Sequence, residues 1–210
     1  MSATDHPLLN AVRSRLKGTQ PPPLPPVLDM PTARGGVDAF CQALEAVEGQ
    51  VHRVKSSEDG LLILRGLAAD RSWNAIACSD AAALSSWRDS VGLACHVHGL
   101  RDPIPRSELL EMDVGLCTAQ LGIAETGTLV LCSESERHRL VSLVPPASVI
   151  VLFARDLVPD LASALRQLQT QALPTTTSFI TGPSRTADIE LTLTVGVHGP
   201  RSVDVILIEG

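Results

Sequence analysis

The chain has 210 residues and a formal net charge of −6, with 44% hydrophobic residues but only 2% aromatic residues. An acidic chain lacks the positive charge that binds a nucleic-acid backbone, and so few rings argue against binding single strands by base stacking. No apolar run approaches the roughly 18 residues of a membrane-spanning helix. The first residues lack the basic start and apolar stretch of a secretion signal, so we expect a cytoplasmic protein without a membrane span.

The chain is predicted to begin with an arm, residues 1–32, that precedes a globular domain, residues 33–210. Apolar residues recur at helical spacing from Asp5 to Lys17, with Asp5 as a helix cap. Six prolines then follow between Gln20 and Pro31. Such a composition predicts a stiff, extended linker without a core of its own.

The first half of the domain alternates between predicted helices and strands, which is typical of parallel βαβ units. The apolar run in Ser57–Leu67 suits a helix or a buried strand, and we favour the helix because Ser57 and Glu58 resemble a helix start. Asp80 is the expected cap of the helix that it begins. Helices are expected at Val37–Glu48, Ser57–Leu67, Asp80–Ser90 and Ser107–Met112, and strands at Val51–Val54, Asn74–Cys78 and Leu93–Val97.

The middle of the chain interrupts this alternation. Two predicted strands, Val114–Ala119 and Thr128–Leu131, flank the segment Gly122–Gly127 and predict an inserted β-hairpin or β-arch. The continuous apolar run Val149–Phe153 is typical of a central strand in a parallel sheet. Beyond it we expect a helix at Asp156–Gln171 and strands at Thr175–Ile180 and Val203–Ile208, with Leu191–Val197 as a strand or an irregular extended segment.

A turn with the sequence GPSRT begins at Gly182, after one of these strands. Ser184 or Thr186 can cap a short helical turn there. The N–H groups at a helix start attract anions, and Arg185 would add a charged fork suited to a carboxylate or phosphate. The turn is therefore a candidate anion site.

Several ionisable residues admit two interpretations. Arg185 can instead pair with Asp188 or Glu190 in an ordinary turn. Glu125 would suit acid–base or nucleophilic chemistry if it were buried, because burial raises the pKa of a carboxyl group, whereas at a turn tip it is a surface residue. His198, in a glycine–proline loop, can be a general base or a hydrogen-bonding cap.

The cysteine pattern predicts no metal centre in this chain. No two of the five cysteines are close enough for a CxxC motif, so a zinc ribbon or an iron–sulfur cysteine run is excluded. The cysteines are expected to act as small buried hydrophobic residues. His96 and His98 face the same side of a strand, but no third metal ligand is identifiable nearby. No GxGxxG dinucleotide loop occurs either.

Several segments of the second half follow one another in a recognisable order. Together they resemble the LutC/YkgG-type lactate-utilisation proteins, whose shared module is the LUD domain. The resemblance is specific from Asp113 to Ile208 and loose before it. The segments are Asp113–Gly115, Ala124–Thr128, Arg139 with Ser142–Pro145, Gly182–Glu190 and Gly196–Pro200.

This resemblance implies a fold of the NagB/RpiA/CoA-transferase type, a three-layer α/β sandwich around a mainly parallel sheet, here with the inserted hairpin. It also implies a role in the oxidation of lactate to pyruvate, as one subunit of a complex. No redox cofactor is expected in this chain, and iron–sulfur clusters are expected only in partner subunits. The ligand of this chain would be a small organic acid or a phosphate-type anion.

In that role Glu125 and His198 are the expected catalytic, proton-handling residues. The alternative is an independent enzyme of the CoA-transferase or cyclo-ligase type, with Glu125 as nucleophile and a CoA ester or nucleotide as ligand. A scaffold without a ligand is a third interpretation. The expected anion-binding residues are Thr126, Gly127, Thr128, Gly182, Ser184, Arg185, Thr186, Asp188 and Gly199.

Overall fold

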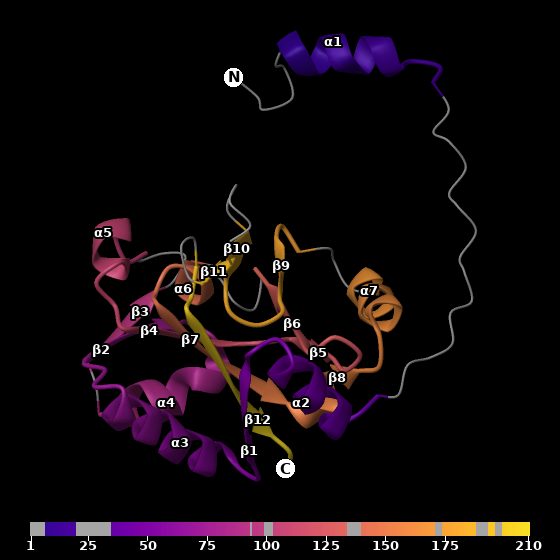
Figure 1. Cartoon of the computed structure of the whole chain (residues 1–210). Coiled ribbons are helices and arrows are strands. Elements are labelled where there is room, and N and C mark those ends of the chain that lie inside the picture. The colour runs from indigo at the N-terminus through magenta and orange to yellow at the C-terminus, as the bar shows by residue number, and fades with distance from the viewer. Residues whose placement is uncertain are drawn as a thin grey trace. The chain divides into compact units, whose positions relative to one another are not determined.

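A computed structural model describes residues 7–19, 35–92, 94–98, 103–133, 140–170, 174–187, 193–195 and 199–210 (Figure 1). The chain divides into two units, Met1–Pro31 and Thr32–Gly210. The first unit contains helix α1, Pro7–Leu16, which confirms the predicted helix over those residues. The predicted cap, Asp5, lies outside the described residues.

Six parallel strands form the central sheet of the second unit, in the order β1-β12-β7-β4-β2-β3. Strands β7 and β12 are mainly apolar and lie side by side inside the sheet, as expected for strands covered on both faces. The strands are β1 Gln50–Val54, β2 Ala75–Ser79, β3 Ala94–His98, β4 Val114–Thr118, β7 Ala147–Phe153 and β12 Ser202–Ile208.

Helices α3, Ser57–Asp70, and α4, Ser85–Ser90, cover one face of this sheet (Figure 1). The Ser56 side chain caps α3 by accepting a hydrogen bond from the backbone N–H of Asp59. Buried side chains of both helices pack against strands β2, β7 and β12. The preference for a helix over a strand in this apolar segment is confirmed.

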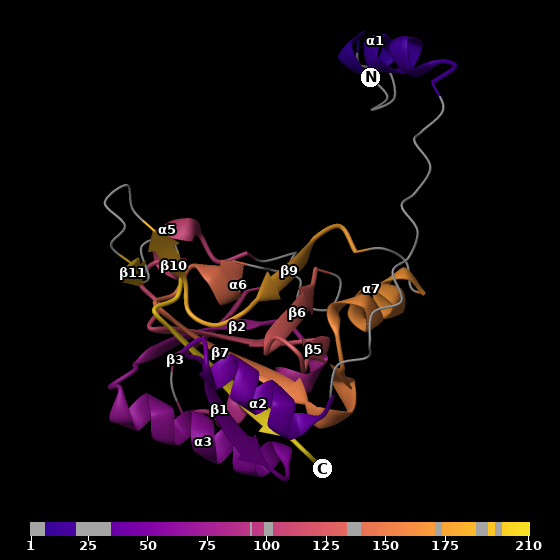
Figure 2. The same ribbon diagram turned by 45° about the vertical axis from the view of Figure 1, so that its right-hand side comes forward.

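The opposite face is covered by helix α2, Val37–Glu45, and by a second, smaller sheet (Figures 1 and 2). Phe40 and Leu44 of α2 share a core with Leu129 of the small sheet and Val205 of β12. Strand side chains alternate between the two faces of the central sheet, so each face forms its own apolar core. The protein is therefore a three-layer α/β sandwich, as predicted.

The small sheet has the order β8-β5-β6-β9 and contains the inserted hairpin, formed by β5, Leu121–Ile123, and β6, Thr128–Cys132. The predicted partner of β6, Val114–Ala119, was wrong, because β4 belongs to the central sheet. The chain passes from one sheet to the other at Gln120, whose side-chain carbonyl accepts a hydrogen bond from the Cys132 N–H at 2.6 Å. The remaining strands of this sheet are β8 Leu157–Val158 and β9 Thr177–Ile180.

Two predicted helices start later than expected. The segment after Asp80 begins with a 3₁₀ turn, η1, Ala82–Leu84, whose N-cap is Ala81, so the predicted cap was wrong. Helix α7 spans Leu161–Gln169 instead of Asp156–Gln171, and Asp160 caps it by accepting from the Ser163 N–H at 2.7 Å.

Helix α7 begins later than predicted because strand β8 and Pro159 precede it. The prediction assigned the apolar residues of β8 to the helix. Leu161 and Leu165 of this helix are 46% and 44% exposed, whereas Ala164 is buried. In the described part of the chain, no helix is long and apolar enough to cross a membrane. The shortest helices are α5 Arg106–Leu109, α6 Leu140–Leu143 and the 3₁₀ turn η2 Ala154–Asp156.

Candidate functional site

The turn between β5 and β6 packs closely against helix α2. Gly127 has a φ of 64°, in the left-handed region, and a Cβ at this position would collide with the backbone nitrogen of Leu44. Only glycine meets both conditions without strain. Glu125, at the same turn, is exposed, and its backbone N–H donates to the carbonyl oxygen of Pro159 at 3.0 Å. The burial that would have favoured a catalytic role for Glu125 is therefore absent.

A row of three threonine hydroxyls connects this turn to the end of strand β9. The Oγ1 atoms of Thr126 and Thr128 are 2.6 Å apart, and those of Thr128 and Thr181 are 2.7 Å apart. Three hydroxyls carry three protons, and two hydrogen bonds within the row use only two of them. One hydroxyl proton thus remains for donation outside the row.

The threonine row lines a cavity of about 400 Å³. The other lining residues are apolar, and three of them, Leu161, Leu165 and Phe179, are 44–46% exposed. Thr128 is buried, whereas Thr126 and Thr181 are exposed. A mainly apolar cavity with a few polar groups on one side is typical of a small-molecule site. The predicted residues Thr126 and Thr128 lie in it, next to Thr181, Phe179 and Ile123.

The turn after Thr181 approaches the same end of α2. Gly182 has a φ of 83°, and a Cβ there would lie 2.7 Å from the carbonyl oxygen of Val47. The predicted turn segments thus converge near the end of one helix, although more than fifty residues separate Gly127 from Gly182 in the sequence.

The predicted helical turn at Ser184 or Thr186 is wrong. Arg185–Ala187 forms strand β10, which pairs antiparallel with β11, Leu193–Val195. The backbone N–H of Ser184 donates to the carbonyl oxygen of Pro200 at 2.9 Å. No helix N-terminus is therefore present at this turn to attract an anion.

The turn nevertheless meets another predicted residue. A Cβ on Gly199 would lie 3.0 Å from the Cβ of Ser184, so the two segments are in contact. The structure thus brings together the turn at Gly182 and the loop at Gly199. Two further predicted site residues, Asp188 and His198, lie outside the described residues.

Arg185 binds the end of α2 rather than a residue of its own turn. Its Nη2 atom is 2.9 Å from a carboxylate oxygen of Glu48, and it also donates to the Val47 carbonyl oxygen at 3.4 Å. Both side chains of the ion pair are exposed, and exposed ion pairs are weak. An incoming carboxylate can therefore replace Glu48 at small cost. The alternative partners considered from the sequence, Asp188 and Glu190, are not among the described residues.

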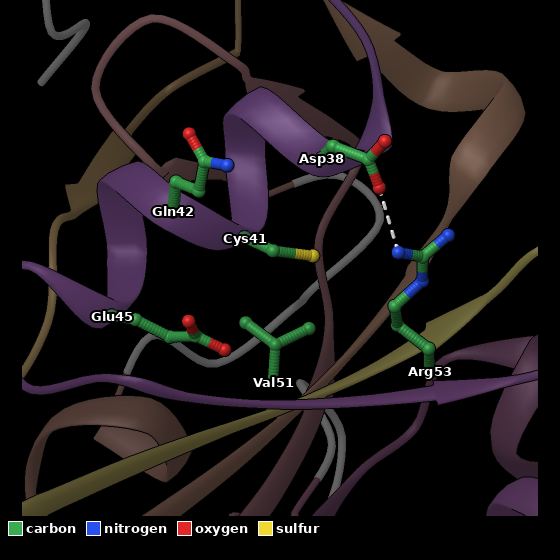
Figure 3. Close-up of a pocket in the computed structure, with 6 residues that line it drawn as sticks. All are labelled: Asp38, Cys41, Gln42, Glu45, Val51 and Arg53. Carbon is green, nitrogen blue, oxygen red and sulfur yellow. Dashed lines mark hydrogen bonds and ion pairs between the residues drawn. The ribbon is translucent and has the colours of Figure 1, made fainter.

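A second hollow lies between α2 and β1 (Figure 3). It has a volume of about 320 Å³, and its lining includes the Cys41 thiol and the Arg53 guanidinium. Arg53 donates to Asp38 at 2.7 Å and to Glu209 at 2.7 Å, and these hydrogen bonds raise the pKa of Arg53. Burial raises the pKa of the Cys41 thiol. The positive charge in this hollow is thus already paired, and the thiol is neutral.

A buried carboxylate that the sequence reasoning missed lies inside the central sheet, on the strand next to β1. Asp204, on β12, is fully buried, and its oxygens bind Nη1 and Nη2 of Arg71 at 2.6 and 2.9 Å. Nε2 of His52 lies 3.0 Å from the same carboxylate. The only signal in the sequence is one acidic residue inside the apolar run from Val203 to Ile208. Among the residues described, no group of three or more His, Cys, Asp or Glu side chains forms a metal site.

Comparison with known proteins gives matches at three levels. The model of the LUD domain matches residues 37–208. "Lactate utilization protein C" of Halalkalibacterium halodurans is 37% identical over 127 residues, which cover 58% of this chain and 54% of that protein. "Uncharacterized protein YkgG" of Escherichia coli is 38% identical over 108 residues, 49% of this chain and 47% of that protein.

The chain therefore spans about half the length of the named relatives that it matches. A crystal structure described as a DUF162 family protein from Deinococcus radiodurans superposes with a TM-score of 0.59 at 20% identity. The superposition covers 81% of this chain and 94% of that one. At this identity the likeness concerns the fold, and it agrees with the three-layer α/β architecture.

Proposed function

The chain belongs to the LUD domain family, and we propose that it acts in lactate utilisation, as a subunit of a complex that oxidises lactate to pyruvate. The observation that carries this proposal is the similarity to proteins named lactate utilization protein C. In this proposal the iron–sulfur clusters that accept electrons belong to partner subunits. This chain contributes the binding of a small organic acid.

The cavity beside the threonine row supports the binding part of this proposal. Lactate and pyruvate combine a methyl group, a carboxylate and a second oxygen function. The apolar wall formed by Leu161, Leu165 and Phe179 suits the methyl group, and the spare hydroxyl proton of the row can be donated to an oxygen. A cavity of about 400 Å³ is larger than a three-carbon acid, so a partner side chain or a larger acid would share it.

Arg185 supports the choice of an anion. It lies four residues after Thr181, and its present partner, Glu48, is an exposed carboxylate. A guanidinium group can bind a carboxylate through two parallel hydrogen bonds. The present ion pair with Glu48 is exposed, and exposed ion pairs are weak, so Glu48 competes poorly for Arg185. In the proposed complex the carboxylate of the organic acid takes the place of Glu48.

The test is a tagged pull-down from cells grown on lactate, with iron and sulfide analysis of the captured material. We expect iron–sulfur proteins to copurify and only the assembly to oxidise lactate. A matched pull-down from cells grown on glucose controls for nonspecific capture. If the chain is captured alone and colourless from lactate-grown cells, it is not a subunit of such a complex.

A further inference from the structure

Two cysteines that play no part in the proposed function lie on adjacent strands. Cys78 is on β2 and Cys95 is on β3, and these parallel strands pair with Ile76 opposite Cys95 and Cys78 opposite Val97. Residues two apart on a strand point to the same face of the sheet, so Cys78 points to the same face as Ile76 and its partner Cys95. The two cysteines are therefore diagonal neighbours on adjacent strands. Both also belong to the apolar core beneath α3 and α4.

The two thiols interact directly. A hydrogen bond with the Cys78 side chain lowers the pKa of Cys95, against the effect of burial, and the positive charge of Arg88 lowers it further. The Cys78 thiol donates a hydrogen bond to the carbonyl oxygen of Ser79 at 3.3 Å. Cys78 is fully buried, whereas Cys95 is partly exposed. Cys95, whose pKa is lowered, is thus the thiol that a small reagent can reach.

Arg88 is held beside this pair by the backbone. Its Nη1 atom donates to the carbonyl oxygen of Ser79 at 3.2 Å, at the end of strand β2. Asp89, the next residue, opposes its effect on Cys95. A nearby guanidinium group stabilises a thiolate, and the thiolate is the reactive form of cysteine.

We propose that Cys95 and Cys78 form an oxidisable dithiol, in which a hydroperoxide oxidises Cys95 and Cys78 then closes a disulfide. In the first step the Cys95 thiolate sulfur attacks one peroxide oxygen and the O–O bond breaks. The other oxygen takes a proton and leaves as water or an alcohol, and Cys95 becomes a sulfenic acid.

In the second step the Cys78 sulfur attacks the Cys95 sulfur. The S–S bond forms, the S–O bond breaks, and the hydroxide leaves with the Cys78 proton as water. The two electrons that reduce the peroxide come from the two thiols. The hydroperoxide is the only oxidant that the sequence of steps requires.

The position of β3 allows this closure. A disulfide requires a specific separation and orientation of the two Cβ atoms. Cysteines that are diagonal neighbours on adjacent strands must move closer together to meet this requirement. Strand β3 is the last strand of the central sheet, and among the described strands it pairs only with β2. A local movement of β3 at Cys95 therefore disturbs only the ladder with β2.

The chain contains a matched control thiol. Cys41 is buried, burial raises its pKa, and the carboxylates of Glu45 and Asp38 act in the same direction. Cys41 should therefore react with hydroperoxides more slowly than Cys95. Its substitution by serine should leave the oxidation of the pair unchanged.

The experiment treats the full chain with hydrogen peroxide, blocks the remaining thiols by alkylation and maps the products by peptide mass spectrometry. We expect a Cys78–Cys95 disulfide that dithiothreitol reverses. In Cys78→Ser we expect a sulfenic acid at Cys95 that dimedone traps, and in Cys95→Ser neither product. Circular dichroism and a second variant, Cys78→Ala, separate these effects from unfolding.

Three outcomes would overturn the proposal. One is the absence of a Cys78–Cys95 disulfide in the folded chain, and another is the absence of a dimedone adduct at Cys95 in both folded Cys78 variants. The third is oxidation of Cys41 at least as fast as oxidation of Cys95. Each outcome is read from the chain itself and does not depend on lactate oxidation.

Discussion

The Nη1 and Nη2 atoms of Arg71 donate hydrogen bonds to the two carboxylate oxygens of Asp204, at 2.6 and 2.9 Å. This contact connects the C-terminal end of helix α3 to strand β12. The carboxylate is fully buried, and the arginine is 28% exposed. Arg71 also lies over the ring of Trp73, 5.3 Å from its centroid. A buried charge needs such partners, because an unpaired carboxylate in the core is strongly destabilising.

Replacement of Asp204 by asparagine should destabilise the fold by about 3 kcal/mol, because it leaves Arg71 and His52 without their charged partner. The free energy of unfolding in urea measures this loss. Asp38→Asn is the control, because it breaks the exposed contact with Arg53 and should have a much smaller effect. Equal losses of unfolding free energy in the two variants would show that the buried contact stabilises the fold no more than the exposed one.

The stability of the protein should also fall in acid in a way that depends on Asp204. Burial alone would raise the pKa of Asp204, but hydrogen bonds from His52 and Arg71 outweigh it and hold that pKa below its usual value. A group with a lowered folded-state pKa stabilises the fold fully above its unfolded value of about 3.9. That contribution is lost as the pH falls from there through the folded-state pKa.

The measurement is the urea midpoint of the wild type and of Asp204→Asn, taken from about pH 7 to about pH 2. The difference between the two proteins should be constant near neutrality and should shrink below about pH 4. A difference that stays constant over the whole range would contradict the assignment of acid sensitivity to Asp204.

Substitution of Gly127 by alanine should cost roughly 2–4 kcal/mol, because a left-handed backbone and a collision with Leu44 both oppose a Cβ at this position. Urea unfolding measures the loss. Gly66→Ala is the control, since Gly66 lies within α3 and a Cβ there has nothing within 4 Å. That variant should gain about 0.5–1 kcal/mol. Similar stabilities of the two variants would argue against close packing of the turn on α2.

Replacement of Thr128 by valine should remove both hydrogen bonds of the threonine row with little change in shape. The loss of stability should be about 1 kcal/mol, because Thr126 and Thr181 are exposed and can bind water instead. Lactate oxidation by the assembled complex should fall much more. Thr177→Val, on strand β9 but not among the residues that line the cavity, serves as the control. Full activity of Thr128→Val would exclude the row from ligand binding.

Arg185 and Glu48 provide a test that separates a binding role from a structural one. Arg185→Ala should abolish growth on lactate without unfolding the protein, because the proposed carboxylate loses its cation. Glu48→Gln should preserve growth, since it only releases Arg185 from its present partner. If the pair is merely structural, the two variants should behave alike, and growth of the folded Arg185→Ala variant on lactate would contradict the binding role.

The apolar pattern of the sequence was sufficient to predict a parallel α/β core, whereas the three-layer arrangement was predicted from the family resemblance. Strand β7 contains the continuous apolar run Val149–Phe153, and the start of helix α3 was recognisable at Ser57 and Glu58, directly after its N-cap Ser56. These features depend on local periodicity and capping, which neighbouring residues determine.

The wrong predictions concern places where consecutive segments belong to different sheets or elements although both are apolar. The apolar residues from Val114 to Ile123 continue almost unbroken, yet they belong to two sheets that meet at Gln120. At Leu157 a two-residue strand precedes the helix, and periodicity alone assigns it to the helix. Pairing with a distant strand decides both cases, and no local pattern records it.

The candidate site was predicted in part for the same reason. The glycines at 127 and 182 mark turns in the sequence, but their common contact with the end of α2 is a long-range relationship. Thr181 has no motif that distinguishes it from other threonines, and only the fold places it next to Thr128. Asp204 is recognisable as unusual within an apolar strand, whereas its partners are not.

The strand order has a consequence for how this protein is made. Strand β1 pairs only with β12 within the described sheet, and the contact between His52 and Asp204 joins residues 152 positions apart. On the ribosome, β1 emerges early but has no strand to pair with until β12 has been synthesised. The edge of β7 that receives β12 stays open from the synthesis of β7 until that of β12. Completion of the central sheet therefore waits for the synthesis of β12, and unpaired strand edges of the nascent chain are open to aggregation until then.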